Sequence, residues 1–293
     1  MSHLQSVYVI TGPTCSGKSA YALELAQKQN GVIINADAMQ LYRELPRLTA
    51  QPTVEEMQQV PHRLYAVLDG EDICTAARWV SMAAEEIQSC WSAGALPLLV
   101  GGSGMYLQAL MQGIAKVPAI PLTLRTELRA RMKQEGNAAF HAWFSQNDPV
   151  MGARLNAGDT QRVLRAAEVW AATGQSLAVW QKAKHQPLLP QATYRMFAIG
   201  RPRAQLYERI NARFRQMLEA GALIEVQTLA ARQLSTELPV MRSHGVPELL
   251  AYLSGSLTLE AAIHIAQQNT RHYAKRQSTW IRHQFPNAEP ILL

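Results

Sequence analysis

A glycine-rich segment directly after an apolar strand constrains the fold of this chain more than any other feature. Residues 7–11 (VYVIT) are apolar and rich in β-formers, and residues 12–19 read GPTCSGKS, which matches the phosphate-loop pattern G-x-x-x-x-G-K-S. Residues 18–29 follow with apolar side chains at helical spacing. A strand, a phosphate loop and a helix in this order indicate an α/β protein with a P-loop.

The residue types in this loop suit a bound phosphate group. Gly12 and Gly17 allow backbone conformations that turn N–H groups toward phosphate. Lys18 supplies a mobile positive charge, and the Ser19 hydroxyl is placed to bind Mg²⁺. The phosphate can belong to a nucleotide or to another ligand. The residues expected to bind it are Gly12, Pro13, Thr14, Cys15, Ser16, Gly17, Lys18 and Ser19.

Short apolar strands alternate with helices along the first third of the chain. After the phosphate loop, the pattern predicts strands at 31–35, 63–68 and 96–100 and helices at 75–91 and 105–111. Wholly apolar strands separated by helices are typical of a parallel sheet with both faces covered. The fold class predicted is therefore α/β, a P-loop NTPase-like parallel sheet flanked by helices.

Polar or glycine-rich residues follow three of the predicted strands, at 12–19, 37–40 and 101–103. Because the carboxyl ends of parallel strands meet at one edge of a sheet, we expect these segments to line one crevice. Asp37 can act there as a base or a metal ligand, or it can cap the start of a helix. Residues 101–104 (GGSG) can belong to the site or form only a tight turn.

A change in composition after residue 117 indicates an inserted domain. The chain from 119 to 187 contains helical patterns rich in Arg, Ala and Gln and no convincing strand, and an apolar strand at 194–200 then returns to the sheet. We therefore predict a P-loop core domain made of residues 1–118 and 188–293, interrupted by an all-helical insertion at 119–187.

Positive charge is in excess, with 28 Lys and Arg against 22 Asp and Glu and a net charge of +6. This balance favours a polyanionic partner but also fits a merely basic enzyme. In the insertion, Gln161, Arg162 and Arg165 share one helix edge, and Arg271 and Lys275 lie on a basic face near the end of the chain. Each group suits either nucleic-acid contact or a solvated surface.

The cysteines and the apolar segments indicate the cellular compartment of the protein. The three cysteines form no C-x-x-C pair, so the sequence predicts neither a disulfide framework nor a zinc site, and a reducing compartment fits. No apolar run reaches the length of a membrane span, and the N-terminus does not have the pattern of a signal peptide. We expect a cytoplasmic, monomeric protein with no membrane partner.

Six motifs in order make nearly the whole chain resemble the bacterial tRNA dimethylallyltransferases, also called tRNA isopentenyltransferases. They lie at residues 12–19 (GPTCSGKS), 35–43 (NADAMQLYR), 60–62 (VPH), 98–107 (LLVGGSGMYL), 159–162 (DTQR) and 270–280 (TRHYAKRQSTW). The chain departs from the family pattern at Gln51, where Lys is usual, at Ser103, where Thr is frequent, and within 242–249.

The resemblance implies transfer of the dimethylallyl group from dimethylallyl diphosphate to N6 of the adenosine that lies 3′ to a tRNA anticodon, with release of pyrophosphate. The loop would then hold the donor's diphosphate with Mg²⁺ bound by Ser19, Asp37 would be the general base, and Lys18 and Arg203 would hold the leaving group. The implied contacts to the anticodon stem-loop are Asp37, Ala38, Met39, Gln40, Ser103, Arg125, Gln161, Arg162, Val163, Leu164, Arg165, Arg271, Lys275 and Arg276.

Three other functions are compatible with a phosphate loop and a helical insertion. A kinase for a nucleotide or another small molecule would bind ATP, and so would a nucleic-acid-stimulated ATPase. A third possibility keeps the prenyl transfer but uses free AMP or ADP as acceptor. The basic insertion disfavours the last of these, because a mononucleotide needs no such surface.

Overall fold

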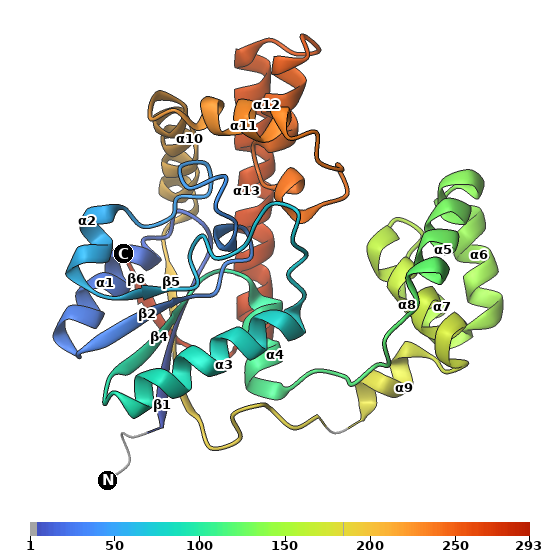
Figure 1. Ribbon diagram of the computed structural model, residues 1–293, viewed down its shortest axis with the longest axis horizontal. Helices are drawn as coiled ribbons and strands as arrows, with labels where there is room; N and C mark the ends of the chain where they lie inside the picture. Colours follow the sequence, from blue (N-terminus) through green and yellow to red (C-terminus); the bar gives the residue numbers. More distant parts are fainter. Residues whose placement is uncertain (1–4, 184) are drawn as a thin grey trace. The chain divides into compact units, whose positions relative to one another are not determined.

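The structure, a computed structural model, describes residues 5–183 and 185–293 (Figure 1). The chain divides into two compact units, one formed by Met1–Met111 with Pro187–Leu293 and the other by Gln112–Gln186. The first unit is mixed α/β and the second is helical. The helical unit begins at Gln112, earlier in the chain than the predicted start of the insertion at residue 119. Residues 1–4 and 184, which the predicted domains include, lie outside the described residues.

Within the described residues of the first unit, six strands form one parallel sheet with the order β3-β2-β4-β1-β5-β6. The strands are β1 (Ser6–Thr11), β2 (Gly31–Asn35), β3 (His62–Arg63), β4 (Leu96–Val100), β5 (Thr193–Gly200) and β6 (Glu289–Leu292). The strands predicted at 7–11, 31–35, 96–100 and 194–200 are confirmed, and so is the predicted fold class of a P-loop-type parallel sheet flanked by helices.

Helices surround this sheet, and a run of helices separates β5 from β6 in the sequence (Figure 1). They are α1 (Lys18–Lys28), η1 (Met39–Leu41), α2 (Val54–Gln59), α3 (Ala76–Ser92), α4 (Gly104–Gln112), α10 (Arg203–Glu219), α11 (Ala222–Ala231), η2 (Pro239–Arg242), α12 (Val246–Leu253) and α13 (Leu259–Gln284). Among the described helices, none combines the length and the apolar composition needed to cross a membrane.

Both faces of the sheet are buried. Ile33 of β2 and Leu98 of β4 pack in one apolar cluster with Ala22 of α1. Because successive side chains of a strand point to opposite faces, Ile34 and Leu99 lie on the other face, and both are fully buried as well. Two covered faces explain why these strands read as continuous apolar runs in the sequence.

The register of the sheet ends three neighbouring strands at the same level. Ile10 of β1 pairs with Val100 of β4, and Val100 pairs with Asn35 of β2. The backbone links continue past the strands, because Gly101 N–H donates to Ile10 O (3.2 Å) and Ala36 N–H donates to Val100 O (2.8 Å). The three segments that follow these strands therefore begin side by side.

The strand predicted at 63–68 is wrong beyond its first residue, because β3 contains only His62–Arg63. Leu64 and Ala66 have positive φ angles of 61° and 53°, a left-handed conformation that cannot continue a strand. The Leu64 carbonyl accepts instead a hydrogen bond from the Asn35 side-chain amide (2.9 Å). The segment is a loop that packs on the end of β2.

The second unit is built from helices with a core of their own. They are α5 (Leu122–Glu135), α6 (Asn137–Asn147), α7 (Pro149–Arg154), α8 (Thr160–Thr173) and α9 (Leu177–Lys182). Phe140 and Phe144 of α6 pack with Val163, Ala166 and Ala167 of α8, and all five side chains are fully buried. This unit therefore has a hydrophobic core independent of the sheet.

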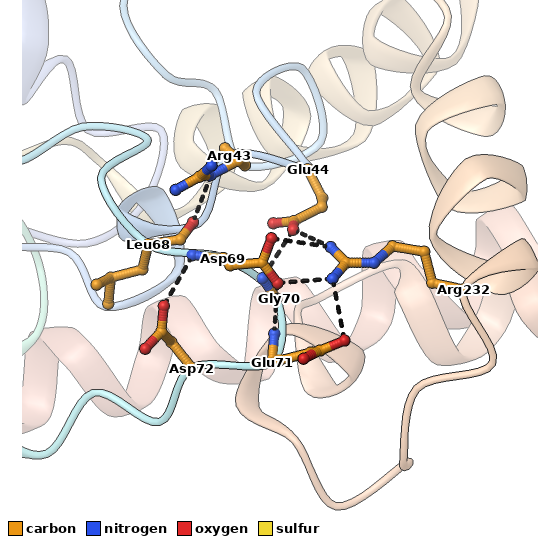
Figure 2. A network of polar contacts seen from close by, with 8 residues as sticks. All are labelled: Arg43, Glu44, Leu68, Asp69, Gly70, Glu71, Asp72 and Arg232. Carbon is orange, nitrogen blue, oxygen red and sulfur yellow. Dashed lines mark hydrogen bonds and ion pairs between the residues drawn. The ribbon is translucent and has the colours of Figure 1, made fainter.

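An arginine network joins the segment after β2 to the loop after β3 (Figure 2). Arg232, which follows α11, binds the carboxylates of Glu44, Asp69 and Glu71, and Glu44 also accepts the N–H of Gly70 (2.7 Å). One guanidinium thus holds two loops against α11. The loops that extend from the carboxyl edge of β2 are fixed by ion pairs as well as by packing.

Glu225 of α11 provides a second polar link to the segment after β2. Its side chain is 6% exposed and accepts the backbone N–H groups of Arg47 (2.8 Å) and Leu48 (3.0 Å). Replacing the carboxylate with a methyl group would leave buried donors without partners.

We predict that Glu225→Ala lowers the free energy of unfolding by about 2–4 kcal/mol, because two hydrogen bonds to a charged acceptor are lost. Urea unfolding followed by circular dichroism measures the change. Glu208→Ala, on the exposed side of α10, is the matched control and should stay within about 0.5 kcal/mol of the parent. Equal effects of the two substitutions would contradict this role for Glu225.

Candidate functional site

The phosphate loop closely approaches the neighbouring backbone. Gly17, just before α1, has a φ of 105°, and Cys15 has a φ of 63°. A Cβ on Gly12 would lie 2.3 Å from the carbonyl oxygen of Ile199, so only glycine fits there. The left-handed conformations and this close contact give the loop the tight turn expected of a phosphate-binding loop.

Lys18 is folded back along the loop. Its Nζ donates to the carbonyl oxygen of Pro13 (2.9 Å). Burial lowers the pKa of the Lys18 ammonium from 10.5 to about 8, opposed by the nearby Asp37 carboxylate and reinforced by the Arg213 guanidinium. An anion on the loop would raise the pKa of Lys18 again, because an opposite charge favours the ammonium form.

Arginines that follow β5 or lie on α10 contact the loop. Arg201 donates to the carbonyl oxygen of Ser16 (3.1 Å), Arg209 donates to the carbonyl of Cys15 (3.3 Å), and Arg213 donates to the Thr14 hydroxyl. Arg209 and Arg213 are four residues apart on α10, so their side chains lie on one face of the helix. That spacing was visible in the sequence, but the packing of the helix beside the loop was not.

Arg203, the predicted partner of Lys18, lies elsewhere. It is the exposed first residue of α10, and its guanidinium lies over the ring of Tyr207 at 5.2 Å. Arg203 lines neither the cavity that contains Lys18 and Ser19 nor the adjoining cavity that contains His244 and Tyr273, whereas Arg213 lines both. The structure therefore offers Arg209 and Arg213 as the cations beside a phosphate ligand.

Asp37 is oriented by the buried Asn35 at the end of β2. The Asn35 side chain accepts the N–H of Asp37 (2.7 Å) and donates to its carbonyl oxygen (3.0 Å). Asp37 Oδ1 in turn accepts the N–H of Met39 (3.0 Å). Ser103 lies next to this turn, since its hydroxyl accepts the N–H of Ala38 (2.9 Å).

Two cavities meet at Asp37. The larger, of about 610 Å³, contains Lys18, Ser19 and Arg209 on its walls, and we term it the phosphate cavity. The smaller, of about 230 Å³, has mainly apolar and aromatic walls, and we term it the aromatic cavity. Asp37 and Arg213 line both. A carboxylate and a guanidinium thus stand where the two cavities adjoin.

Aromatic and apolar side chains dominate the smaller cavity. His244 and Tyr273 are in ring contact, with centroids 4.5 Å apart, and Phe214 and Met217 of α10 contribute apolar wall. Burial lowers the pKa of His244, which keeps the imidazole neutral near pH 7. This cavity suits a flat or apolar group, because its aromatic faces can stack and most of its wall is apolar, with Asp37, Arg213 and Arg242 as its charged residues.

The remaining predicted contacts in the first unit fall into two groups. Gln40 is turned inward, since its amide donates to the carbonyls of Thr49 (2.9 Å) and Ala50 (2.8 Å) while it lines the phosphate cavity. Arg271 is likewise engaged, by the Asn211 side chain (2.6 Å). Lys275 and Arg276 of α13 are exposed and line an open groove that also includes His272, Thr279, Trp280, His283 and Gln284.

The helical unit gathers arginines around one buried acid. Glu168 is 7% exposed, and its carboxylate lies 3.7 Å from Arg125 Nε, 4.0 Å from Arg129 Nε and 3.6 Å from Arg165 Nη1. Three half-exposed cations against one carboxylate leave a positive surface. Sequence reasoning missed Arg129 and Glu168, although Arg125 and Arg129 share a face of α5 by their spacing.

Residues 161–164 at the start of α8 divide between surface and core. Gln161 and Arg162 are exposed. Val163 and Leu164, also predicted as RNA contacts, are buried in the core of the helical unit, so their side chains pack internally and present no surface to a partner.

The metal prediction concerns Ser19, the second residue of α1. Its side chain lines the phosphate cavity and makes no hydrogen bond within the described part of the chain. The described residues contain no group of three or more His, Cys, Asp or Glu side chains that could hold a metal ion by themselves. Such a setting fits an ion held mainly by phosphate oxygens and water, which is how Mg²⁺ is usually bound.

Comparison with known proteins identifies close relatives. The chain is 47% identical over 278 residues to a tRNA dimethylallyltransferase of Nitrobacter hamburgensis (95% of this chain, 88% of the relative). It is 49% identical over 288 residues to one from Rhodospirillum centenum (98% and 92%). The resemblance inferred from the six motifs is therefore confirmed.

Solved structures agree with this grouping. The tRNA isopentenylpyrophosphate transferase of Bacillus halodurans matches with a TM-score of 0.70 and 33% identity over 98% of this chain and 89% of that one. A eukaryotic dimethylallyltransferase, whose structure was described as acting on tRNA, matches with a TM-score of 0.82 and 26% identity (99% and 73%). The model of the IPP transferase family matches residues 40–284, and the chain belongs to this family.

Proposed function

We propose that this chain transfers the dimethylallyl group of dimethylallyl diphosphate to N6 of the adenosine that lies 3′ to the anticodon of tRNAs, releasing pyrophosphate. The observation that carries the proposal is the position of Asp37, on the wall shared by a cationic phosphate cavity and an aromatic cavity. A two-substrate transfer needs a base at the point where donor and acceptor meet.

The phosphate cavity supplies what the leaving group requires. As the bond between C1 of the donor and its bridging oxygen breaks, negative charge grows on the diphosphate. Lys18 Nζ and the guanidiniums of Arg209 and Arg213 line this cavity and stabilise that charge. The turned backbone of the loop adds N–H donors at the start of α1.

Asp37 completes the transfer on the acceptor side. The N6 amine of adenine is a weak nucleophile because its lone pair is delocalised into the ring. As N6 bonds to C1, the amine acquires positive charge and releases a proton to the Asp37 carboxylate. One C–N bond forms, one C–O bond breaks, and the products are N6-dimethylallyl adenosine and pyrophosphate.

Mg²⁺ bound by the Ser19 hydroxyl and the diphosphate oxygens would add charge neutralisation on the leaving group. Ser19 lies on the same wall as Lys18, so both would contact the same end of the donor. The Lys18 ammonium can move from the Pro13 carbonyl to a phosphate oxygen without breaking a buried ion pair, because that carbonyl is its hydrogen-bond partner.

A polynucleotide acceptor accounts for the basic surfaces. Gln161 and Arg162 are exposed on the helical unit, and Arg125, Arg129 and Arg165 surround a single buried carboxylate. Such surfaces bind RNA backbone, whereas free AMP or an ATP-dependent kinase reaction would not require them. The target adenine would leave its stack to enter the site. We expect the protein to act as a cytoplasmic monomer.

Asp37→Asn should reduce the single-turnover rate of transfer by on the order of 10²- to 10⁴-fold and leave tRNA affinity unchanged, because the amide cannot accept the proton. Mass spectrometry of nucleosides from an unmodified tRNA measures the gain of one C5H8 unit on adenosine. Parallel reactions contain dimethylallyl diphosphate or ATP. An unchanged rate removes Asp37 as base, and phosphate release from ATP without prenylation would mean instead that the loop binds a nucleotide.

Arg213→Ala should weaken pyrophosphate binding on the order of 10- to 100-fold, because a charged donor beside the loop is lost. Arg203→Ala is the matched substitution in the same helix and should change the affinity little, since Arg203 lies over Tyr207. Isothermal titration with pyrophosphate and Mg²⁺ compares the two variants. A larger loss in Arg203→Ala would reinstate Arg203 as the leaving-group cation.

The double variant Arg162→Ala, Arg165→Ala should weaken tRNA binding and flatten its salt dependence, because each lost phosphate contact lowers the slope of log affinity against log salt by roughly 0.7 to 0.9. Filter binding over a series of KCl concentrations gives the slopes. Lys133→Ala, Lys182→Ala removes the same charge from exposed positions of the same unit. Equal losses in both double variants would show that only net charge matters.

A further inference from the structure

A buried amide on α13 links the phosphate loop to the neighbouring glycine-rich loop. Gln277 is 5% exposed. Its Oε1 accepts the backbone N–H of Thr14 (2.8 Å), and its Nε2 donates to the carbonyl oxygen of Gly102 (3.1 Å). Both halves of the amide are therefore engaged with backbone, one half in each loop.

Helix α13 approaches the glycine-rich loop very closely around this side chain. A Cβ on Gly102 would lie 2.0 Å from Gln277 Nε2, and a Cβ on Gly104 would lie 2.1 Å from the ring of Trp280, one turn further along α13. The two glycines allow the helix to approach the loop this closely. Ala274, one turn earlier, packs with Cys15 of the phosphate loop.

The second loop continues the chain of contacts to Asp37. Ser103, next to Gly102, donates its N–H to the carbonyl of Ala36 (3.1 Å), and its hydroxyl accepts the N–H of Ala38 (2.9 Å). These two residues flank Asp37. A continuous path of hydrogen bonds thus runs from Thr14 through Gln277 and Ser103 to the backbone on either side of the carboxylate.

We propose that Gln277 is a positioning residue that sets the phosphate loop and Asp37 at the separation required for prenyl transfer. This inference rests on the proposed function. The backbone N–H of Thr14 already donates to the Gln277 amide oxygen, so this N–H does not also bind the ligand. The effect of Gln277 is on geometry: a displacement of about 1 Å between reacting groups can cost about 100-fold in rate.

Gln277→Met keeps the approximate length of the side chain and removes both hydrogen bonds. Gln268→Met, at an exposed position of the same helix, is the matched control. With enzyme in excess over tRNA, we expect the rate constant for Gln277→Met to fall on the order of 10- to 100-fold. The rate constant of the control and the tRNA affinity of both variants should equal those of the parent.

The single-turnover rate constant separates positioning from a merely structural role. A partly unfolded variant would require more total enzyme to saturate the tRNA, and at saturation its folded fraction would still react at the parental rate constant. That result would overturn the proposal. If Gln277→Met does not fold, Gln277→Glu retains an acceptor for Thr14 but loses the donor to Gly102, and it should also lower the rate constant.

A binding measurement keeps this inference distinct from the proposed function. If the parent protein transfers no dimethylallyl group, the proposed function fails, and titration with pyrophosphate and Mg²⁺ still tests the effect of Gln277 on the loop. Weaker pyrophosphate binding by Gln277→Met than by Gln268→Met would support that effect. Equal affinities, together with equal rate constants, would overturn it.

Discussion

The candidate site depends on one constraint, the common level at which β1, β4 and β2 end. Parallel strands expose their last carbonyls and the N–H groups of the following residues at one edge. Here the N–H of Ala36 donates to the carbonyl of Val100, and the N–H of Gly101 donates to the carbonyl of Ile10. Three segments must therefore leave the sheet together. A loop that binds anions, a carboxylate and a glycine-rich turn become neighbours because the register of the sheet allows nothing else.

The charges at this edge are arranged asymmetrically, and that asymmetry suits transfer more than binding alone. Lys18 and Arg209 line only the phosphate cavity, whereas Arg213 and Asp37 line both cavities, and within the described residues Asp37 makes no direct ion pair with any of these cations. The Asp37 carboxylate is oriented instead by the backbone N–H of Met39, which donates to its Oδ1.

Local chemistry was predictable and long-range packing was not. The phosphate loop, Asp37 and Ser103 are specified by residues next to a strand end, so the sequence predicted their place correctly. Arg203 was predicted as a leaving-group cation from the family resemblance, and nothing local in the sequence reveals that Arg213, on another turn of α10, lies against the loop. Val163 and Leu164 follow Arg162 in the chain, but the helix turns them into the core. Leu64 and Ala66 were predicted as strand residues because the residue types at these positions give no sign of their positive φ angles.

Helix α13 has a basic exposed face and a buried face, and the buried face contacts the candidate site. Successive residues of a helix point about 100° apart, so Lys275 and Arg276 face outward while Gln277 is buried against two loops. A buried amide is costly unless both its oxygen and its nitrogen are bound. Here both are, and each partner is a backbone group of the candidate site. The same helix that presents cations to solvent therefore fixes the geometry of the catalytic edge.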